Sequence, residues 1–184
     1  MSQSTVISAL VSAFSSDAVA VQFSDGDPYI HDNAPDVAGI PLAVVFAESA
    51  ADVQTTLRIA RQYDVPVVAR GAGTGTTGGA VSDGGIVLSL ERMNQVIEVD
   101  VASRVAVVEP GVVTGELQRA VEDQGLFYPP DPASLDTCTI GGNIAENAGG
   151  PRGMKYGVTR DYVLGLEGYW ANGEPFKLGG KPHK

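Results

Sequence analysis

The eleven residues from Arg70 to Ala80 read RGAGTGTTGGA and contain five glycines. Glycine at this density suits a backbone that adopts φ > 0, or one that a ligand touches closely. Successive N–H groups in such a loop can converge on an anion, usually a phosphate. We therefore predict a phosphate cradle made of backbone amides, with Arg70 as a local cation. An ordinary flexible loop is the alternative.

The spacing Gly73-x-Gly75-x-x-Gly78 matches a dinucleotide-binding fingerprint. That fingerprint opens a helix, which holds the pyrophosphate at its N-terminus. Here apolar runs at 65–69 and 86–90 flank the loop and read as strands, with no helix between them. A P-loop is excluded as well, because no Lys-Ser or Lys-Thr pair follows the glycines. The prediction is a strand–loop–strand connection that binds phosphate.

A second glycine-rich element spans residues 139–150, where the Gly-Gly pair at 141–142 permits close contact with a ligand. Asn143, Glu146 and Asn147 follow at helical spacing, so a short helix would carry polar groups on one face beside this contact. An asparagine amide can both donate and accept hydrogen bonds, as recognition of a heterocycle edge requires. A helix start that is capped by local polar residues is the alternative.

Hydrophobic periodicity predicts the elements that position the first loop. An amphipathic helix is expected over residues 4–14. Residues 24–38 read as a surface connector, with a site served by their tyrosine, histidine and aspartates as the alternative. A strand at 42–46 is followed by a helix from a Ser49–Asp52 capping box to about residue 63. A strand at 67–69 completes a β–helix–β unit, which implies a parallel pair.

The remaining elements position the second loop. Hairpins are expected at 95–109 and at 162–178, the latter turning at an Asn-Gly pair. Thr114 would cap a helix that stops at Gly125. A short strand is expected at 126–128, before a stiff proline-rich segment.

Composition bounds the class of protein. The 184 residues suit one domain, and a net charge of −10 offers nothing to the polyanion attraction that drives nucleic-acid binding. The single cysteine, Cys138, excludes an internal disulfide framework and reads as a small buried residue. No spacing of His, Cys and carboxylates suggests a metal site. With no signal peptide and no apolar run of the ~20 residues needed to span a bilayer, we expect a cytoplasmic protein.

A family resemblance follows from the order of several motifs. These are PVVARGAGTG at 66–75, Pro110-Gly111, Pro130-Asp131-Pro132, IGGNIAENAGG at 140–150 and Lys155-Tyr156-Gly157. Over roughly residues 41–184 the chain closely resembles the FAD-linked oxidases of the vanillyl-alcohol-oxidase type. The branch it most resembles contains the FAD subunit of glycolate oxidase and the D-lactate dehydrogenases.

The resemblance implies an α+β fold, namely a PCMH-type FAD-binding domain of two small α/β subdomains. It would occupy residues 41–184, follow an N-terminal helix and connector at 1–40, and stop before a substrate cap domain. FAD would be held in an extended pose with its pyrophosphate over the first loop. The binding would be non-covalent, because that loop has no histidine for attachment.

The residues implied to bind FAD belong to both glycine-rich elements and to the segments between them. They are Arg70, Gly71, Ala72, Gly73, Thr74, Gly75, Gly78, Gly79, Ala80, Pro110, Gly111, Asp131, Ser134, Gly141, Gly142, Asn143, Asn147 and Gly149.

Proteins of this kind transfer a hydride from a D-2-hydroxy acid, such as glycolate or D-lactate, to the flavin. They pass the electrons to an acceptor or a partner subunit. The substrate-binding and metal-binding residues of the relatives lie past the position of Lys184, so no catalytic or metal residue is assigned and the chain alone is expected to be inactive. The alternatives are a free-standing FAD-binding module and a reductase of the UDP-N-acetylenolpyruvoylglucosamine type, against which the AENAGG run argues.

Overall fold

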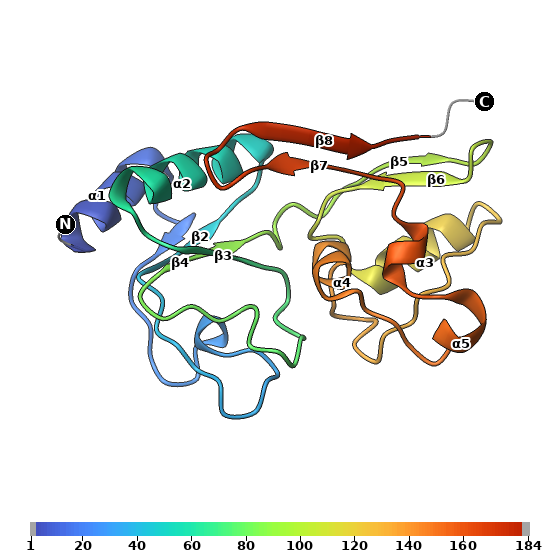
Figure 1. The fold of residues 1–184 in the computed structure, drawn as a ribbon, viewed down its shortest axis with the longest axis horizontal. Coiled ribbons are helices and arrows are strands. Elements are labelled where there is room, and N and C mark those ends of the chain that lie inside the picture. The colour runs from blue at the N-terminus through green and yellow to red at the C-terminus, as the bar shows by residue number, and fades with distance from the viewer. Residues whose placement is uncertain (1–2, 182–184) are drawn as a thin grey trace.

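The computed structural model describes residues 3–181, which form two halves lying side by side (Figure 1). Each half has its own cluster of buried apolar side chains. The first cluster gathers residues such as Leu10, Val45 and Ile86, and the second gathers Val112 and Leu117 with their neighbours. The predicted α+β fold of two small subdomains is therefore present.

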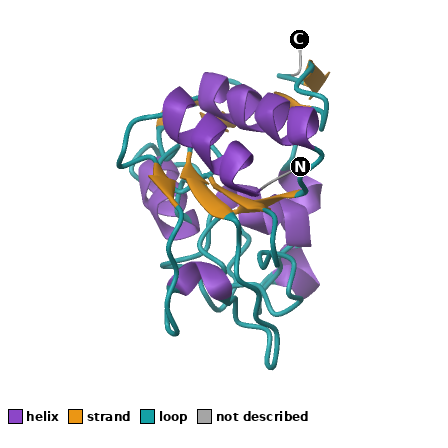
Figure 2. Ribbon diagram, turned by 90° about the vertical axis from the view of Figure 1, so that its left-hand side faces the viewer, coloured by secondary structure: helices purple, strands orange, loops and turns teal. Residues whose placement is uncertain are grey.

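The first half is a four-stranded sheet with two helices. Its elements are α1 (Gln3–Ala13), β1 (Val19–Ala20), the 3₁₀ turn η1 (Pro28–Ile30), β2 (Ala43–Phe46), α2 (Ala50–Tyr63), β3 (Val67–Arg70) and β4 (Ile86–Ser89). Helices α1 and α2 cover one face of the sheet, while the long connections extend beyond its opposite side (Figures 1 and 2). Val6 and Leu10 of α1 are buried in the same core as β2 and β4, so the N-terminal helix is part of this half.

The strand order β1-β2-β4-β3 refines the predicted β–helix–β unit. Strands β2 and β3 are parallel, as that unit implies, but they are not neighbours. Strand β4 lies between them and pairs in parallel with both, so that Ile86 faces Ala43 on one side and Val67 on the other. The connection 71–85 joins two adjacent parallel strands without a helix, which confirms the strand–loop–strand prediction.

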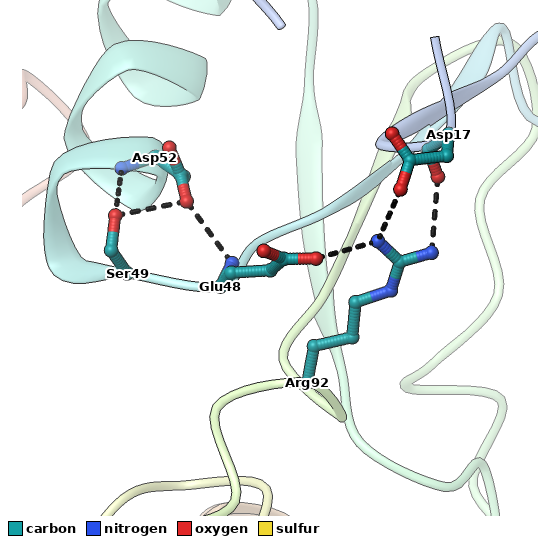
Figure 3. A network of polar contacts seen from close by, with 5 residues as sticks. All are labelled: Asp17, Glu48, Ser49, Asp52 and Arg92. Carbon is teal, nitrogen blue, oxygen red and sulfur yellow. Dashed lines mark hydrogen bonds and ion pairs between the residues drawn. The ribbon is translucent and has the colours of Figure 1, made fainter. Parts of the chain in front are cut away.

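Ser49 and Asp52 start α2 in the predicted capping-box-like way, although Asp52 accepts from Glu48 N rather than from the N–H of the N-cap Ser49 (Figure 3). Ser49 Oγ accepts from Asp52 N at 3.3 Å, and Asp52 Oδ2 accepts from Glu48 N at 3.1 Å. Arg92 joins this corner to the segment before β1, because it donates to Glu48 Oε1 at 2.8 Å and to the Asp17 carbonyl at 3.0 Å. These exposed contacts fix the geometry of the corner more than they add to stability.

The second half consists of β5 (Val96–Asp100), β6 (Val105–Val108), α3 (Thr114–Glu122), α4 (Ile140–Glu146), α5 (Gly153–Tyr156) and the 3₁₀ turn η2 (Thr159–Tyr162). The last hairpin, β7 (Gly165–Tyr169) and β8 (Pro175–Gly179), extends back over α2 of the first half, where Gln54 Nε2 donates to the Gly173 carbonyl at 2.8 Å (Figure 1). Both predicted hairpins are confirmed, and Gly173 supplies the positive φ of 80° in the turn of the second.

Two local predictions in this half are wrong. No strand forms at 126–128, because Leu126 and Tyr128 instead pack on the apolar core beside α3. Thr114 is the first residue of α3 and Val113 is its N-cap. The hydroxyl of Thr114 turns inward to the Cys138 carbonyl at 3.2 Å, which removes it from any capping role.

Candidate functional site

A cavity of about 160 Å³ lies between the first glycine loop and the start of α4. It brings together ten of the residues predicted to bind the cofactor, from segments far apart in the sequence. They are Gly71, Ala72, Gly73, Thr74, Gly75, Gly79, Ala80, Ser134, Gly142 and Asn143. The two glycine-rich elements therefore form one site.

The loop offers free backbone donors to this cavity. Among the described residues, none accepts a hydrogen bond from the N–H groups of residues 72–75, which line the cavity. Unpaired amides at a cavity wall satisfy their hydrogen-bonding capacity with a ligand or with water. A Cβ on Gly75 would meet nothing nearer than the Glu146 carboxyl group, at 3.8 Å, so the space beside this glycine is open. The loop therefore fits a phosphate ligand.

Arg70 supports the loop from within the protein. Its side chain is only 5% exposed and it does not line the cavity. Nη1 donates to the His31 carbonyl at 2.7 Å and to the Ala80 carbonyl at 3.2 Å, and Nη2 donates to the Pro28 carbonyl at 2.8 Å. These bonds tie both ends of the loop to the connector 28–31.

Tyr29 completes the support beneath the loop. The Arg70 guanidinium carbon lies 5.2 Å from the centre of the Tyr29 ring, and the Tyr29 hydroxyl donates to Glu91 Oε2 at 2.8 Å. Burial, followed by this hydrogen bond to Glu91, raises the pKa of Tyr29 to about 12. Burial also lowers the pKa of Arg70, against the opposing effect of Glu91.

The start of α4 forms the opposite wall. Thr139 is its N-cap and accepts from Gly142 N at 3.3 Å, while Gly141 N donates to the Pro110 carbonyl at 2.7 Å. Asn143 is buried, and its Nδ2 donates to Thr114 Oγ1 at 2.6 Å. The Asn143 donor is thus engaged within the protein.

The other predicted residues frame the cavity without lining it. They are Arg70, Gly78, Pro110, Gly111, Asp131, Gly141, Asn147 and Gly149. Asp131 accepts from Arg152 N at 3.1 Å, and Asn147 Oδ1 accepts from Arg160 N at 3.0 Å. Gly111 allows close packing, since a Cβ there would overlap the Leu90 carbonyl. In this structure these residues hold the segments around the site.

The structure adds residues that the sequence analysis did not select. They are Asp32, Ala69, Cys138, Thr139, Ala145, Glu146 and Ala148. Glu146 crosses to the first loop, where its Oε1 accepts from Thr77 Oγ1 at 2.9 Å. Asp32 comes from the segment interpreted as a surface connector. Cys138 is buried as expected, but it also borders the cavity.

The charge of the lining is acidic. Asp32 and Glu146 carry the ionisable carboxylates, and no lysine, arginine or histidine is among the described residues that line the cavity. An anion bound here would rely on neutral backbone amides rather than on a cationic side chain.

A second cavity, of about 620 Å³, lies between α2, β3, β4 and the β7–β8 hairpin. Its lining is mainly apolar and includes Val53, Leu57, Leu88 and Phe176. It lacks the glycine-loop amides, so it is the less suitable site for a phosphate despite its greater volume. Within residues 3–181, no helix has the length and apolar character that crossing a membrane requires.

The sequence of this chain is similar to those of known flavin-binding proteins. A family model described as an FAD binding domain matches residues 41–179. The glycolate oxidase subunit GlcD of Bacillus subtilis is 49% identical over 154 residues, which cover 83% of this chain and 33% of that protein. The D-lactate dehydrogenase of Archaeoglobus fulgidus is 42% identical over 167 residues, covering 88% of this chain and 37% of that protein. The chain thus spans about a third of the length of these curated relatives.

Solved structures agree with the fold. p-Cresol methylhydroxylase with substrate bound superimposes with a TM-score of 0.79 at 25% identity, over 95% of this chain and 35% of that one. 6-Hydroxy-D-nicotine oxidase of Arthrobacter nicotinovorans gives a TM-score of 0.75 at 26% identity, over 88% of this chain and 35% of that one. The expected PCMH-type fold is confirmed.

Proposed function

The chain belongs to the family of FAD-binding domains whose model matches residues 41–179, and on this premise we propose that it is the cofactor-binding part of a flavin-dependent oxidoreductase acting on a small D-2-hydroxy acid. FAD is the cofactor of this family. Because the chain covers only 33% of the length of the Bacillus subtilis relative, the substrate class, the electron acceptor and the activity are all part of the proposal.

The single observation that carries the proposal is the amide-lined cavity. The free N–H groups of residues 72–75 suit the pyrophosphate of FAD, and the glycines let it approach the backbone. When bound, FAD supplies the acceptor for a hydride. The residues of this chain would bind and orient it: the loop would hold the phosphates, Arg70 fixes the loop, and α4 forms the opposite wall.

The names of the relatives support the substrate class. They include a glycolate oxidase subunit, a D-lactate dehydrogenase, and a D-2-hydroxyglutarate dehydrogenase from Stutzerimonas stutzeri that is 42% identical. All three substrates are 2-hydroxy acids. These relatives favour a hydroxy-acid enzyme over the cell-wall reductase alternative. One relative is named as a subunit, and we propose that this protein also has a partner that accepts electrons. A cytoplasmic location stays a prediction.

The test uses the natural protein. An antibody raised against this chain would isolate the polypeptide that contains it, and the released flavin would be identified chromatographically. Glycolate, D-lactate and L-lactate would then be added without oxygen while the flavin absorbance is followed. Bleaching by glycolate and by the D-enantiomer supports the proposal. Bound FAD that none of these acids, nor D-2-hydroxyglutarate, can bleach would refute the substrate class while leaving the cofactor site intact.

A further inference from the structure

Asp32 carries an unexplained buried oxygen. Its Oδ1 accepts from Ala34 N at 2.7 Å, but Oδ2 is buried and has no hydrogen-bond partner. No other buried side-chain nitrogen or oxygen in residues 3–181 is left unpaired in this way. Leaving a buried acceptor unsatisfied is costly, so each case in a native protein calls for a specific reason.

The position of Asp32 is fixed from both sides. The preceding carbonyl, of His31, accepts from Arg70 Nη1 at 2.7 Å. The following amide, of Asn33, donates to the Gly75 carbonyl at 3.0 Å. Asp32 is therefore held against the glycine loop and lines the same cavity as the free amides. Oδ2 itself is buried, although Asp32 as a whole is partly exposed.

The chemistry of the carboxylate restricts its partner. An ionised carboxylate only accepts hydrogen bonds, so its partner must carry a proton. The pyrophosphate that the loop suits is an acceptor as well and would repel Asp32. In FAD the proton-bearing groups next to the pyrophosphate are the hydroxyls of the ribose and of the ribityl chain.

We infer that Asp32 is a cofactor-binding residue whose Oδ2 accepts a hydrogen bond from a sugar hydroxyl of FAD. This rests on the FAD site proposed above. The hydroxyl satisfies the unpaired oxygen and places the carboxylate beside the sugar rather than against the phosphates. The same charge disfavours any ligand that presents a further anionic group at this end of the cavity.

The direction in which the Kd for FAD changes on removing the Asp32 carboxylate distinguishes a hydrogen bond to the sugar from repulsion of the phosphates. We would titrate FAD into wild type, Asp32→Ala and the control Asp25→Ala, which removes an exposed carboxylate from the same connector, and follow flavin fluorescence. The Kd for FAD should rise about tenfold in Asp32→Ala and stay within about twofold in the control. An unchanged or lower Kd in Asp32→Ala would mean that the carboxylate only repels the phosphates or binds water, and would overturn the inference.

A second variant controls for loss of the turn in which Ala34 N donates to the Asp32 side chain. Asp32→Asn keeps an oxygen for Ala34 N and removes the charge, so its Kd should lie between those of wild type and Asp32→Ala. Circular dichroism of each cofactor-free variant confirms the fold.

Two smaller probes identify the sugar. FMN contains the ribityl chain with one phosphate, and ADP contains the ribose with a pyrophosphate. Weaker binding of FMN by Asp32→Ala assigns the ribityl hydroxyl, and weaker binding of ADP assigns the ribose hydroxyl. If FAD binding weakens while both probes bind unchanged, the hydroxyl contact is refuted. A wild-type chain that binds no FAD at all would instead contradict the cofactor site itself.

Discussion

Gly73 lies directly against the guanidinium of Arg70, so that a Cβ on this glycine would overlap the Nη2 atom. Gly73 also has a φ of 68°, which side chains other than glycine rarely adopt. Gly75, two residues on, has neither constraint. Gly73 is thus required by the fold, whereas the space beside Gly75 is open and we expect it to serve the ligand.

This difference predicts opposite outcomes for two substitutions. Gly73→Ala should lower the free energy of unfolding by about 2 kcal/mol, through strained φ and displacement of Arg70. Gly75→Val should change it by less than about 0.5 kcal/mol, because its nearest contact is ordinary. FAD affinity should nevertheless fall at least about tenfold in Gly75→Val, since the side chain occupies the phosphate site. Urea unfolding and FAD titration measure the two effects, and a Gly75→Val protein with normal FAD affinity would contradict the cradle.

Arg70 should be irreplaceable even by lysine. A lysine keeps the charge but lacks the forked donors that reach the carbonyls of Pro28, His31 and Ala80. Arg70→Lys should lower the free energy of unfolding by about 3 kcal/mol. The exposed Arg119→Lys on α3 serves as the matched control and should change it by less than about 0.5 kcal/mol. Equal effects in the two variants would show that the buried bonds do not support the loop.

The alkaline stability of the protein should depend on Tyr29. Its pKa is about 12 in the folded protein, against an ordinary value of 10.0. The unfolded chain therefore loses this proton first, and the contribution of Tyr29 is complete below pH 10 and is lost as the pH rises through about 12. Tyr29→Phe should cost about 1 kcal/mol at neutral pH. The difference between wild type and variant should shrink between pH 10 and 12, and a constant difference across that range would argue against the assignment.

FAD should be held without a covalent bond. The first loop contains no His, Cys or Tyr, but Cys138 borders the cavity and is the one nucleophilic thiol to consider. Its Sγ lies 3.3 Å from Thr114 Oγ1, in the buried contact between α3 and the residues before α4. Acid precipitation of the holoprotein should leave all flavin in the supernatant. Flavin in the pellet of wild type but not of Cys138→Ser would show attachment to this thiol.

The chain alone should not oxidise a 2-hydroxy acid at a useful rate. Such a reaction needs a cation for the substrate carboxylate and a base for the hydroxyl proton, and the described lining of the cavity supplies no cation. The FAD-loaded chain should keep its flavin absorbance when glycolate, D-lactate or D-2-hydroxyglutarate is added without oxygen. Dithionite provides the positive control for reduction. Rapid bleaching by one enantiomer of lactate would prove this prediction wrong.

The sequence predicted the two glycine-rich elements and the strands and helices beside them, because glycine density and apolar periodicity are local properties. It did not predict that β4 lies between β2 and β3, since a β–helix–β pattern gives strand direction but not which strand enters later. Asp32 was missed for a related reason. Its place in the site depends on the contacts of His31 with Arg70 and of Asn33 with Gly75, which join segments about 40 residues apart.

The position of Arg70 in the motif did not predict that its guanidinium binds backbone carbonyls. A cation that opens a glycine loop suggests contact with phosphate, and the family resemblance implies that Arg70 is a cofactor-binding residue. In the structure its guanidinium is used by three backbone carbonyls, so its effect on a ligand passes through the loop. Whether it also approaches FAD remains a prediction. Arg70 is buried by the connector 28–31, whose carbonyls bind it. No hydrophobic periodicity or motif in residues 28–31 predicts that they lie against Arg70.

The strand order of the first sheet has a consequence for synthesis on the ribosome. Strands β2 and β3 are both made before β4, yet each pairs in parallel only with β4. Strand β2 can already pair with β1, but until Ser89 has emerged the edges of β2 and β3 that face β4 have no partner. The sheet of the first half is therefore completed only after the glycine loop has been made. During that interval its unpaired edges are the place where a chaperone would be needed.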